Sequence, residues 1–328
     1  MSKETSLALK GVAILLMLYF HLFNEIGLVE RCTNFCFIDG MPLAYLLSRF
    51  THPVEMFVIL SGYGLYFVYC RGGYDMIKKI KSLYIHYWIS LLLFIPLGAI
   101  LIGPETYPGS FDRIISNVTG WYTNWNGTIW FLFPYCLLAF SSSFVFRIID
   151  RVRPLLVLCV SFVFSLVGMY LVSRFGGSSL YECQILHMPI IYVNLLFSFL
   201  LGAYLLKLDI IKKVKLDRSI CWILLLLLII VRCCFRTGAF HSIFSFLFVI
   251  LFAKASRPVF LNKFLIEMGN KSTSMWFVHA FFCYYYFKDF IYSFKYIPLV
   301  FIALLVCSYV VASILNMINK RIQSFLLK

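Results

Sequence analysis

Ten apolar runs of about 15 to 22 residues, separated by short polar breaks, make up most of the amino-acid sequence. A helix rises about 1.5 Å per residue, so runs of about this length are needed to cross a hydrocarbon layer about 30 Å thick. The sequence therefore predicts an all-α fold, a polytopic transmembrane helical bundle of about ten spans in a single domain over residues 1–328. The predicted spans are residues 9–29, 54–69, 83–102, 127–146, 154–172, 188–206, 219–235, 239–253, 274–290 and 297–318.

The distribution of positive charge sets the expected orientation and argues against nucleic acid as a partner. Hydrophobic residues make up 62% of the chain, and the formal net charge is +15. With the N-terminus inside, 21 of the 29 lysines and arginines fall on the cytoplasmic side and 8 on the outer side, as the positive-inside rule requires. We therefore expect a multi-pass protein of the cytoplasmic membrane with both termini cytoplasmic and with membrane lipids around it.

Lys10 and His21 are predicted to share one face of the first span. Eleven residues at 100° each come to about 1100°, which leaves the two side chains within about 20° of each other and about 16 Å apart along the axis. That face carries a cation at the membrane edge and a titratable ring near the midplane. An ionisable group at such depth indicates a functional site. The alternative is a snorkelling lysine and a histidine that is hydrogen-bonded to a neighbouring helix.

Two carboxylates are candidate partners of His21. Glu25 lies four residues later on the same face, where it either holds one imidazole tautomer or is simply solvated at the helix end. Glu55 enters the second predicted span and needs a partner, for which His21 and His52 are candidates. Ser61 lies near the middle of that span in a Ser-Gly-Tyr-Gly stretch, a pattern typical of close helix packing.

A cluster of cations follows the second predicted span on the inner side. Two partners fit such a cluster, either anionic lipid headgroups or a phosphorylated cofactor that approaches from the cytoplasm. The cluster comprises Arg71, Lys78, Lys79 and Lys81.

Ser272 and His279 share one face of the ninth span, because seven residues come to about 700°. A serine and a histidine at that spacing on one straight helix are too far apart for a direct nucleophile pair. No CxxC pair or His/Cys cluster at zinc spacing occurs in the sequence, so we expect no metal. Cys32 and Cys36 share the first outer loop and either pair in an oxidising compartment or remain thiols.

The outer loop before residue 130 is rich in aromatic, Asn and Gly residues. Its aromatic side chains favour an interfacial belt over a sugar-stacking platform. These are Trp121, Tyr122, Trp125 and Trp130. Asn117 and Asn126 begin N-glycosylation acceptor sequences, which have meaning only in a eukaryotic secretory route.

Three stretches together resemble acyltransferase family 3, integral membrane proteins that O-acylate cell-surface glycans. The first is similar to the family's Arg-x10-His signature, the second to its acidic, aromatic and Ser-Gly-aromatic pattern, and the third to its late Gly, Ser and His spacing. A weaker similarity, at residues 129–132, is to a Trp-Phe-Leu element. The three stretches are Lys10-x10-His21, Val54–Tyr63 and Gly269-x-x-Ser272-x6-His279.

The sequence departs from the family pattern after the second span. Family members often carry an Arg-x-x-Arg pair and then Ile-x-Pro-x-Tyr-Trp. Here Tyr87 and Trp88 fit, but Lys79 and Ser82 occupy the arginine positions and Ile85 occupies the proline position. Lysine offers a point charge where arginine binds phosphate through two hydrogen bonds. The resemblance therefore implies a basic cofactor loop with altered geometry.

The resemblance implies a membrane O-acyltransferase of capsule or exopolysaccharide biosynthesis. The donor would be cytoplasmic acyl-CoA, most often acetyl-CoA, and the acceptor a sugar hydroxyl of an extracytoplasmic polysaccharide or lipid-linked oligosaccharide. His21 would be catalytic, either as general base or as a transient acyl carrier, with Glu55 supporting it. The residues implied to bind the donor are Lys10, Arg71, Lys78, Lys79 and Lys81. Supporting roles are assigned to Glu25, Ser61, Ser272 and His279.

Two other classes of membrane protein are weighed against an acyltransferase. A transporter or flippase for a lipid-linked glycan precursor would use the same intramembrane charges as a path, but no inverted repeat or pair of broken helices is evident in the sequence. A membrane glycosyltransferase or polymerase usually has large outer loops, and here the predicted outer loops are short. Acyl-CoA-dependent labelling of a glycan would separate the enzyme from the transporter.

Overall fold

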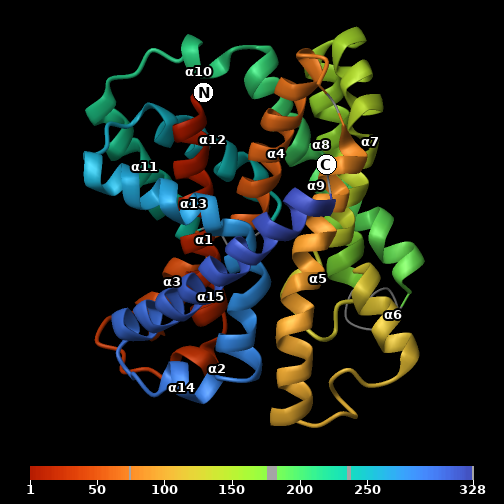
Figure 1. The fold of residues 1–328 in the computed structure, drawn as a ribbon. Coiled ribbons are helices and arrows are strands. Elements are labelled where there is room, and N and C mark those ends of the chain that lie inside the picture. The colour runs from red at the N-terminus through yellow and green to blue at the C-terminus, as the bar shows by residue number, and fades with distance from the viewer. Residues whose placement is uncertain (74, 176–182, 235–237, 327–328) are drawn as a thin grey trace. The chain divides into compact units, whose positions relative to one another are not determined.

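The computed structural model describes residues 1–73, 75–175, 183–234 and 238–326, and most of them are helical (Figure 1). The α-helices are α1 (Lys3–Phe23), α2 (Ile26–Val29), α3 (Leu43–Ser48), α4 (Pro53–Cys70), α5 (Met76–Leu101), α6 (Phe111–Thr119), α7 (Leu132–Arg151), α8 (Pro154–Phe175), α9 (Gln184–Lys207), α10 (Ile210–Lys213), α11 (Arg218–Cys234), α12 (His241–Lys254), α13 (Val259–Ala280), α14 (Lys288–Tyr292) and α15 (Ile297–Leu326). A 3₁₀ turn, η1 (Gly127–Ile129), a π-helical turn, η2 (Phe281–Tyr285), and two short strands, β1 (Phe37–Ile38) and β2 (Met41–Pro42), complete the fold.

The prediction of an all-α polytopic protein is confirmed. Among the described residues, seven helical segments are long and apolar enough to cross a membrane. They are Lys3–Phe23, Leu43–Cys70, Met76–Leu101, Gly127–Arg151, Pro154–Phe175, Gln184–Lys207 and Ile297–Leu326. The other three predicted spans fall on α11, on α12 with its 14 residues, and on the end of α13 with η2. Residue 235, the last of the predicted span 219–235, lies outside the described residues. The count of ten spans and the cytoplasmic termini stay predictions.

The helices form two compact units, each made of several chain segments. The first comprises Met1–Leu9, Val54–Ile77 and Phe131–Leu261, and so contains α4 and α7 to α12. The second comprises Lys10–Pro53, Lys78–Trp130 and Asn262–Lys328, and so contains most of α1, α5, α13 and all of α15. The single-domain organisation expected from the sequence stays a prediction.

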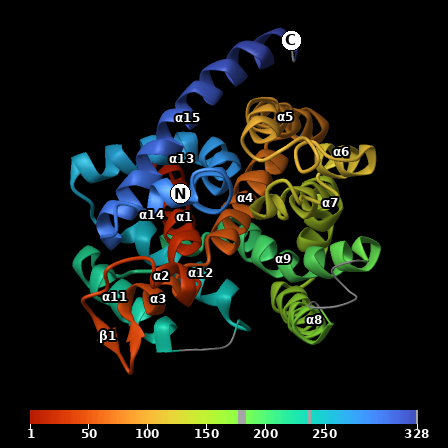
Figure 2. The ribbon, with the colours of Figure 1, turned by 90° about the horizontal axis from the view of Figure 1, so that it is seen from below.

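Glycines set the closest helix packing in the first unit. A Cβ at Gly62 of α4 would collide with the backbone oxygen of Phe199 of α9, and a Cβ at Gly202 of α9 would collide with that of Ile59. The Ser-Gly stretch in the second predicted span therefore packs backbone against backbone, as small residues allow. Helix α8 lies beside α9 (Figures 1 and 2).

Helices α1 and α13 make a similar close approach in the second unit. A Cβ at Gly11 would collide with the backbone oxygen of Leu265. Between α2 and α3 the chain forms the β1–β2 hairpin, visible in Figure 2, in which Phe37 pairs with Pro42. The sequence predicted no strand there. The turn depends on Asp39 and Gly40, which both have positive φ angles, of 49° and 73°.

The aromatic loop before residue 130 is folded into the second unit. Trp125 is only 3% exposed and donates its indole hydrogen to Pro108 O, so the prediction of an interfacial position is wrong for this residue. Asn117 and Asn126 are also buried, and their side-chain amides donate to Arg113 O and Phe277 O, respectively. Because the backbone polar groups of a buried loop need hydrogen-bond partners within the protein, these two side chains have a structural role.

The family-like pair Tyr87 and Trp88 fastens this loop to α5. The Tyr87 hydroxyl donates to Asn117 O at 2.8 Å, and the Trp88 indole donates to Val118 O at 2.9 Å. Both acceptors lie near the C-terminal end of α6, where carbonyl groups lack partners within the helix. The two residues therefore have a structural role. Cys32 and Cys36 are both free thiols.

Candidate active site

The candidate site of the second unit is a pair of histidines from α1 and α13. The imidazole rings of His21 and His279 have centroids 4.9 Å apart, with 39° between their planes. His21 lies in the last turn of α1, and His279 lies one residue before the end of α13. The same two helices also approach each other closely at Gly11 of α1, where the backbone oxygen of Leu265 leaves no room for a side chain. The geometry thus places His279, to which the resemblance assigned a supporting role, beside His21, while the roles of both residues in catalysis stay a prediction.

The tautomer of His279 is set by its own helix. Its Nδ1 lies 3.1 Å from Met275 O and 2.9 Å from Trp276 O. Carbonyl oxygens only accept hydrogen bonds, so Nδ1 carries the proton and Nε2 carries the lone pair. The ring is fully buried, and Nε2 has no hydrogen-bond partner among the residues that the structure describes. A buried acceptor in this state costs about 1–3 kcal/mol unless a bound molecule satisfies it.

His21 is held through its other ring nitrogen, Nδ1, by a tyrosine. The Tyr284 hydroxyl lies 3.2 Å from His21 Nδ1 and 3.3 Å from Asn24 Oδ1. The phenol ring meets the imidazole edge-on, with centroids 5.5 Å apart. Because Nδ1 is engaged, Nε2 is the nitrogen of His21 that is left for a substrate.

Sequence reasoning missed Tyr284 because of the π turn η2. Tyr284 lies five residues after His279, so in a regular α-helix the two side chains would point about 140° apart. In η2 the backbone bonds skip five residues, as in the 2.9 Å bond from Tyr286 N to Phe281 O. The wider turn brings Tyr284 toward the face that carries His279. No signal in the sequence marks this turn.

The two predicted carboxylate partners lie in different surroundings. Glu25 is exposed, and its charge acts on the phenol of Tyr284. Glu55 belongs to the first unit, where it lies half-buried in the first turn of α4 and interacts electrostatically with Arg232. Arg232 is only 3% exposed and hydrogen-bonds to His241, an arrangement that sequence reasoning did not foresee. Support of His21 by Glu55 stays a prediction.

The predicted donor-binding cations are divided between the two units. In the second unit Lys10 is half-buried in α1, and its ammonium is near enough to Lys79 for the two charges to interact. Lys78 and Lys81 are exposed in the first turns of α5. Arg71 is exposed in the first unit, where its guanidinium lies 4.1 Å from the centroid of the Phe67 ring.

The two predicted serines already have hydrogen-bond partners. Ser272 is buried and donates to Gly269 O of its own helix at 2.9 Å. Ser61 hydrogen-bonds with the hydroxyl of Tyr135 in the first unit. These hydrogen bonds go to residues other than His21 and His279, so a supporting role of the two serines stays a prediction.

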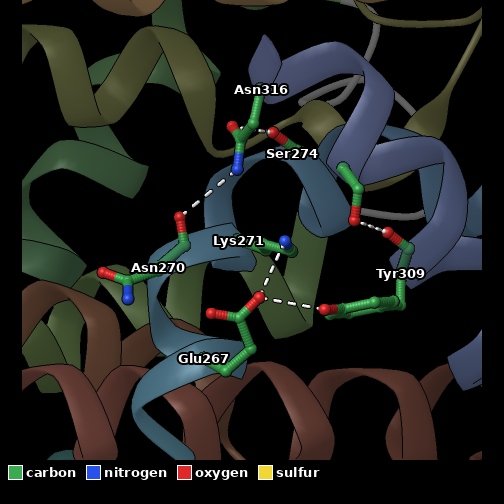
Figure 3. Close-up of polar contacts among 7 residues, drawn as sticks. Glu267, Asn270, Lys271, Ser274, Tyr309 and Asn316 are labelled. Atoms are coloured by element: carbon green, nitrogen blue, oxygen red, sulfur yellow. Dashed lines mark hydrogen bonds and ion pairs between the residues drawn. The ribbon is translucent and has the colours of Figure 1, made fainter.

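A second polar cluster in the second unit joins α13 to α15 and to His86 of α5, and Figure 3 shows its members on α13 and α15. The carboxylate of Glu267 accepts from Lys271 at 2.8 Å and from Tyr309 at 2.9 Å. The Ser274 hydroxyl donates to Asn316 Oδ1 at 2.6 Å and pairs with His86 Nε2 at 2.7 Å. We call these six residues the seam cluster. Tyr309 and Asn316 are seven residues apart on α15, so both face α13.

The comparisons with known proteins agree with the resemblance seen in the sequence. A family model described as an acyltransferase domain, that of acyltransferase family 3, matches residues 8–317 and so runs through both units. Neither the curated proteins nor the solved structures yield a match. Within the described ranges, no three His, Cys, Asp or Glu side chains are grouped so that they could hold a metal ion.

Proposed function

The chain belongs to acyltransferase family 3 and is a multi-pass membrane acyltransferase, and we propose that it O-acylates a cell-surface glycan in the cytoplasmic membrane. In this proposal the donor is cytoplasmic acyl-CoA, most often acetyl-CoA, and the acceptor is a sugar hydroxyl of an extracytoplasmic or lipid-linked polysaccharide. The observation that carries the proposal is the pair of imidazoles, His21 and His279, in which each ring has Nδ1 engaged and Nε2 left for a substrate.

His21 acts as the general base of the transfer. Its Nε2 takes the proton of the sugar hydroxyl while the oxygen attacks the carbonyl carbon of the thioester. The tetrahedral intermediate collapses with cleavage of the bond between carbon and sulfur, and the CoA thiolate takes the proton back from the imidazolium. The rival route, in which His21 Nε2 first carries the acyl group, would leave a trappable acyl-enzyme.

His279 supplies the second nitrogen of the site. Its Nε2 lone pair is buried beside His21, and a hydroxyl of the acceptor sugar is a donor that would satisfy it. A hydrogen bond there would orient the sugar hydroxyl toward the thioester. His279 would thus raise the rate by orienting the acceptor, without itself transferring a proton.

The test uses acyl-CoA carrying a labelled acyl group, with the protein in liposomes and surface glycan from a deletion strain as acceptor. His21→Ala should lower the transfer rate by about 10²- to 10⁴-fold and leave membrane insertion intact. His187→Ala, a change at another buried histidine, in α9, is the matched control and should transfer normally. O-acylation retained in His21→Ala, measured by mass spectrometry of the glycan, would refute the assignment. Glycan transport without label transfer would indicate the flippase instead.

The donor site is tested at Lys10. Lys10→Glu places a carboxylate where we propose that a phosphate of the donor binds, so the KM for acyl-CoA should rise by about 10-fold or more. Lys263→Glu, at an exposed lysine in α13 of the same unit, is the control for general charge effects. An equal KM for wild type and Lys10→Glu would remove Lys10 from the donor site.

A further inference from the structure

The hydroxyl of Tyr284 lies between two polar groups at the C-terminal end of α1. It is 3.2 Å from His21 Nδ1 and 3.3 Å from Asn24 Oδ1. Both distances are long for hydrogen bonds. Tyr284 reaches this place from η2, so α1 and the π turn together build the arrangement.

The number of protons decides the direction of each bond. A phenol has one hydrogen to donate and lone pairs with which to accept. Asn24 Oδ1 can only accept, so the phenol hydrogen is directed to it. Tyr284 then accepts at His21, and His21 Nδ1 must be the donor. The proton of the neutral imidazole is therefore on Nδ1, and Nε2 is a base.

We propose that Tyr284, oriented by Asn24, is a positioning residue that holds His21 in the tautomer with its proton on Nδ1. This inference rests on the proposed role of His21 as the base, because only the Nδ1-protonated tautomer has a lone pair on Nε2. His279 reaches the same tautomer by a different route, through the carbonyls of its own helix. The two rings therefore offer matching nitrogens to one substrate.

The role belongs to Tyr284 rather than to the acidic residue near it. Glu25 is exposed and acts on the phenol through its charge. Tyr292 offers an internal comparison, because its hydroxyl donates to Leu22 O at 2.8 Å. That bond ties α14 to α1 one residue away from His21 without touching the imidazole. Tyr292→Phe thus removes another tyrosine hydrogen bond to the end of α1, one that does not involve His21, and serves as the matched control.

The first test reads the tautomer directly. The full-length protein, labelled with ¹⁵N-histidine, is examined by NMR in nanodiscs, and the His21 signals are assigned by their loss in His21→Gln. Wild type and Tyr292→Phe should show a protonated Nδ1. Asn24→Leu frees the phenol hydrogen for His21 Nδ1 and should move the ring proton to Nε2, whereas Asn24→Asp keeps an acceptor and should not. A wild-type ring protonated at Nε2, or an unchanged tautomer in Asn24→Leu, would overturn the proposal.

The second test separates positioning from packing by kinetics. Tyr284→Phe and Asn24→Leu should lower kcat by about 10- to 100-fold at an unchanged KM for acyl-CoA, and Asn24→Asp should restore most of kcat. Tyr292→Phe should keep the wild-type kcat. An equal loss in Tyr292→Phe would show that any weakening of the α1 packing suffices, and would overturn the proposal.

The two tests also separate this inference from the proposed function. The NMR result does not require a working assay, so it stands even where no acyl transfer is found. If acyl transfer depends on His21 but the wild-type ring carries its proton on Nε2, the proposed function stands and only the proposed role of Tyr284 is refuted.

Discussion

Helix α13 carries two polar clusters whose hydrogen bonding differs. The seam cluster, formed by Glu267, Lys271, Tyr309, Ser274, Asn316 and His86, pairs its charges and hydroxyls with one another. Figure 3 shows the five members on α13 and α15. The histidine pair engages only one nitrogen of His279, whose Nε2 finds no partner in residues 1–73, 75–175, 183–234 and 238–326. Buried polar groups in proteins are nearly always paired. The saturated cluster is therefore expected to support the fold, and the unsaturated pair to bind a substrate.

The neighbouring elements cause this difference. α15 presents Tyr309 and Asn316 toward the seam cluster, and these side chains match the groups on α13. At the other end of α13, α1 presents His21, whose own Nδ1 is taken by Tyr284. The same helix thus carries the seam cluster from Glu267 to Ser274 and, one turn farther on, the histidine to which we assign a substrate-binding role.

Between the two clusters on α13, the larger effect on activity is expected at His279. His279→Leu removes the Nε2 lone pair and should lower kcat by about 10- to 100-fold. The same change removes a buried nitrogen that lacks a partner among the described residues, so thermal stability should stay equal or rise. Initial transfer rates and thermal unfolding in detergent measure the two effects. Full activity together with lower thermal stability would show that His279 has a structural role, and would contradict the proposed difference between the histidine pair and the seam cluster.

An effect of opposite kind is expected in the seam cluster. Ser274→Ala leaves the hydrogen-bonding atoms of His86 and Asn316 without the serine that joins them, so the protein should lose about 1–3 kcal/mol of stability. Transfer activity should change little at a temperature where the variant remains folded. Ser313→Ala is the control, because that hydroxyl donates only to Tyr309 O of its own helix, and its loss should cost less. Denaturation curves test both, and equal curves for the two variants would contradict the seam role.

The smallest effect expected is the pH dependence of the ion pair. The bonds from Lys271 and Tyr309 lower the pKa of the Glu267 carboxyl below its usual value. The pair therefore stabilises the fold above the unfolded pKa, and this stabilisation is lost as the pH falls through the lower folded pKa. The Glu267 side chain is 44% exposed, so the contribution is under about 1 kcal/mol. The stability difference between wild type and Glu267→Gln should shrink on acidification, and a constant difference would contradict the pairing.

The sequence was most informative where a regular helix places residues by simple rotation. The apolar runs located the helices, and the eleven-residue spacing selected His21. The Ser-Gly stretch correctly indicated backbone packing, seen at Gly62. It was least informative where the backbone leaves that geometry or where distant segments supply partners. The π turn hid Tyr284, and the fold of the aromatic loop buried Trp125.

The sequence by itself determined a membrane-embedded helical protein with a histidine in its first helix, because apolar length and charge placement are local properties of the chain, and its motifs carried the resemblance to an acyltransferase family. Only the tertiary structure decided which atoms of that histidine are in use. Hydrogen bonding joins residues far apart in the chain, as between His21 and Tyr284, and each bond depends on helix packing at ångström precision. For that reason the structure, and not the pattern, distinguishes the saturated seam cluster from the histidine pair.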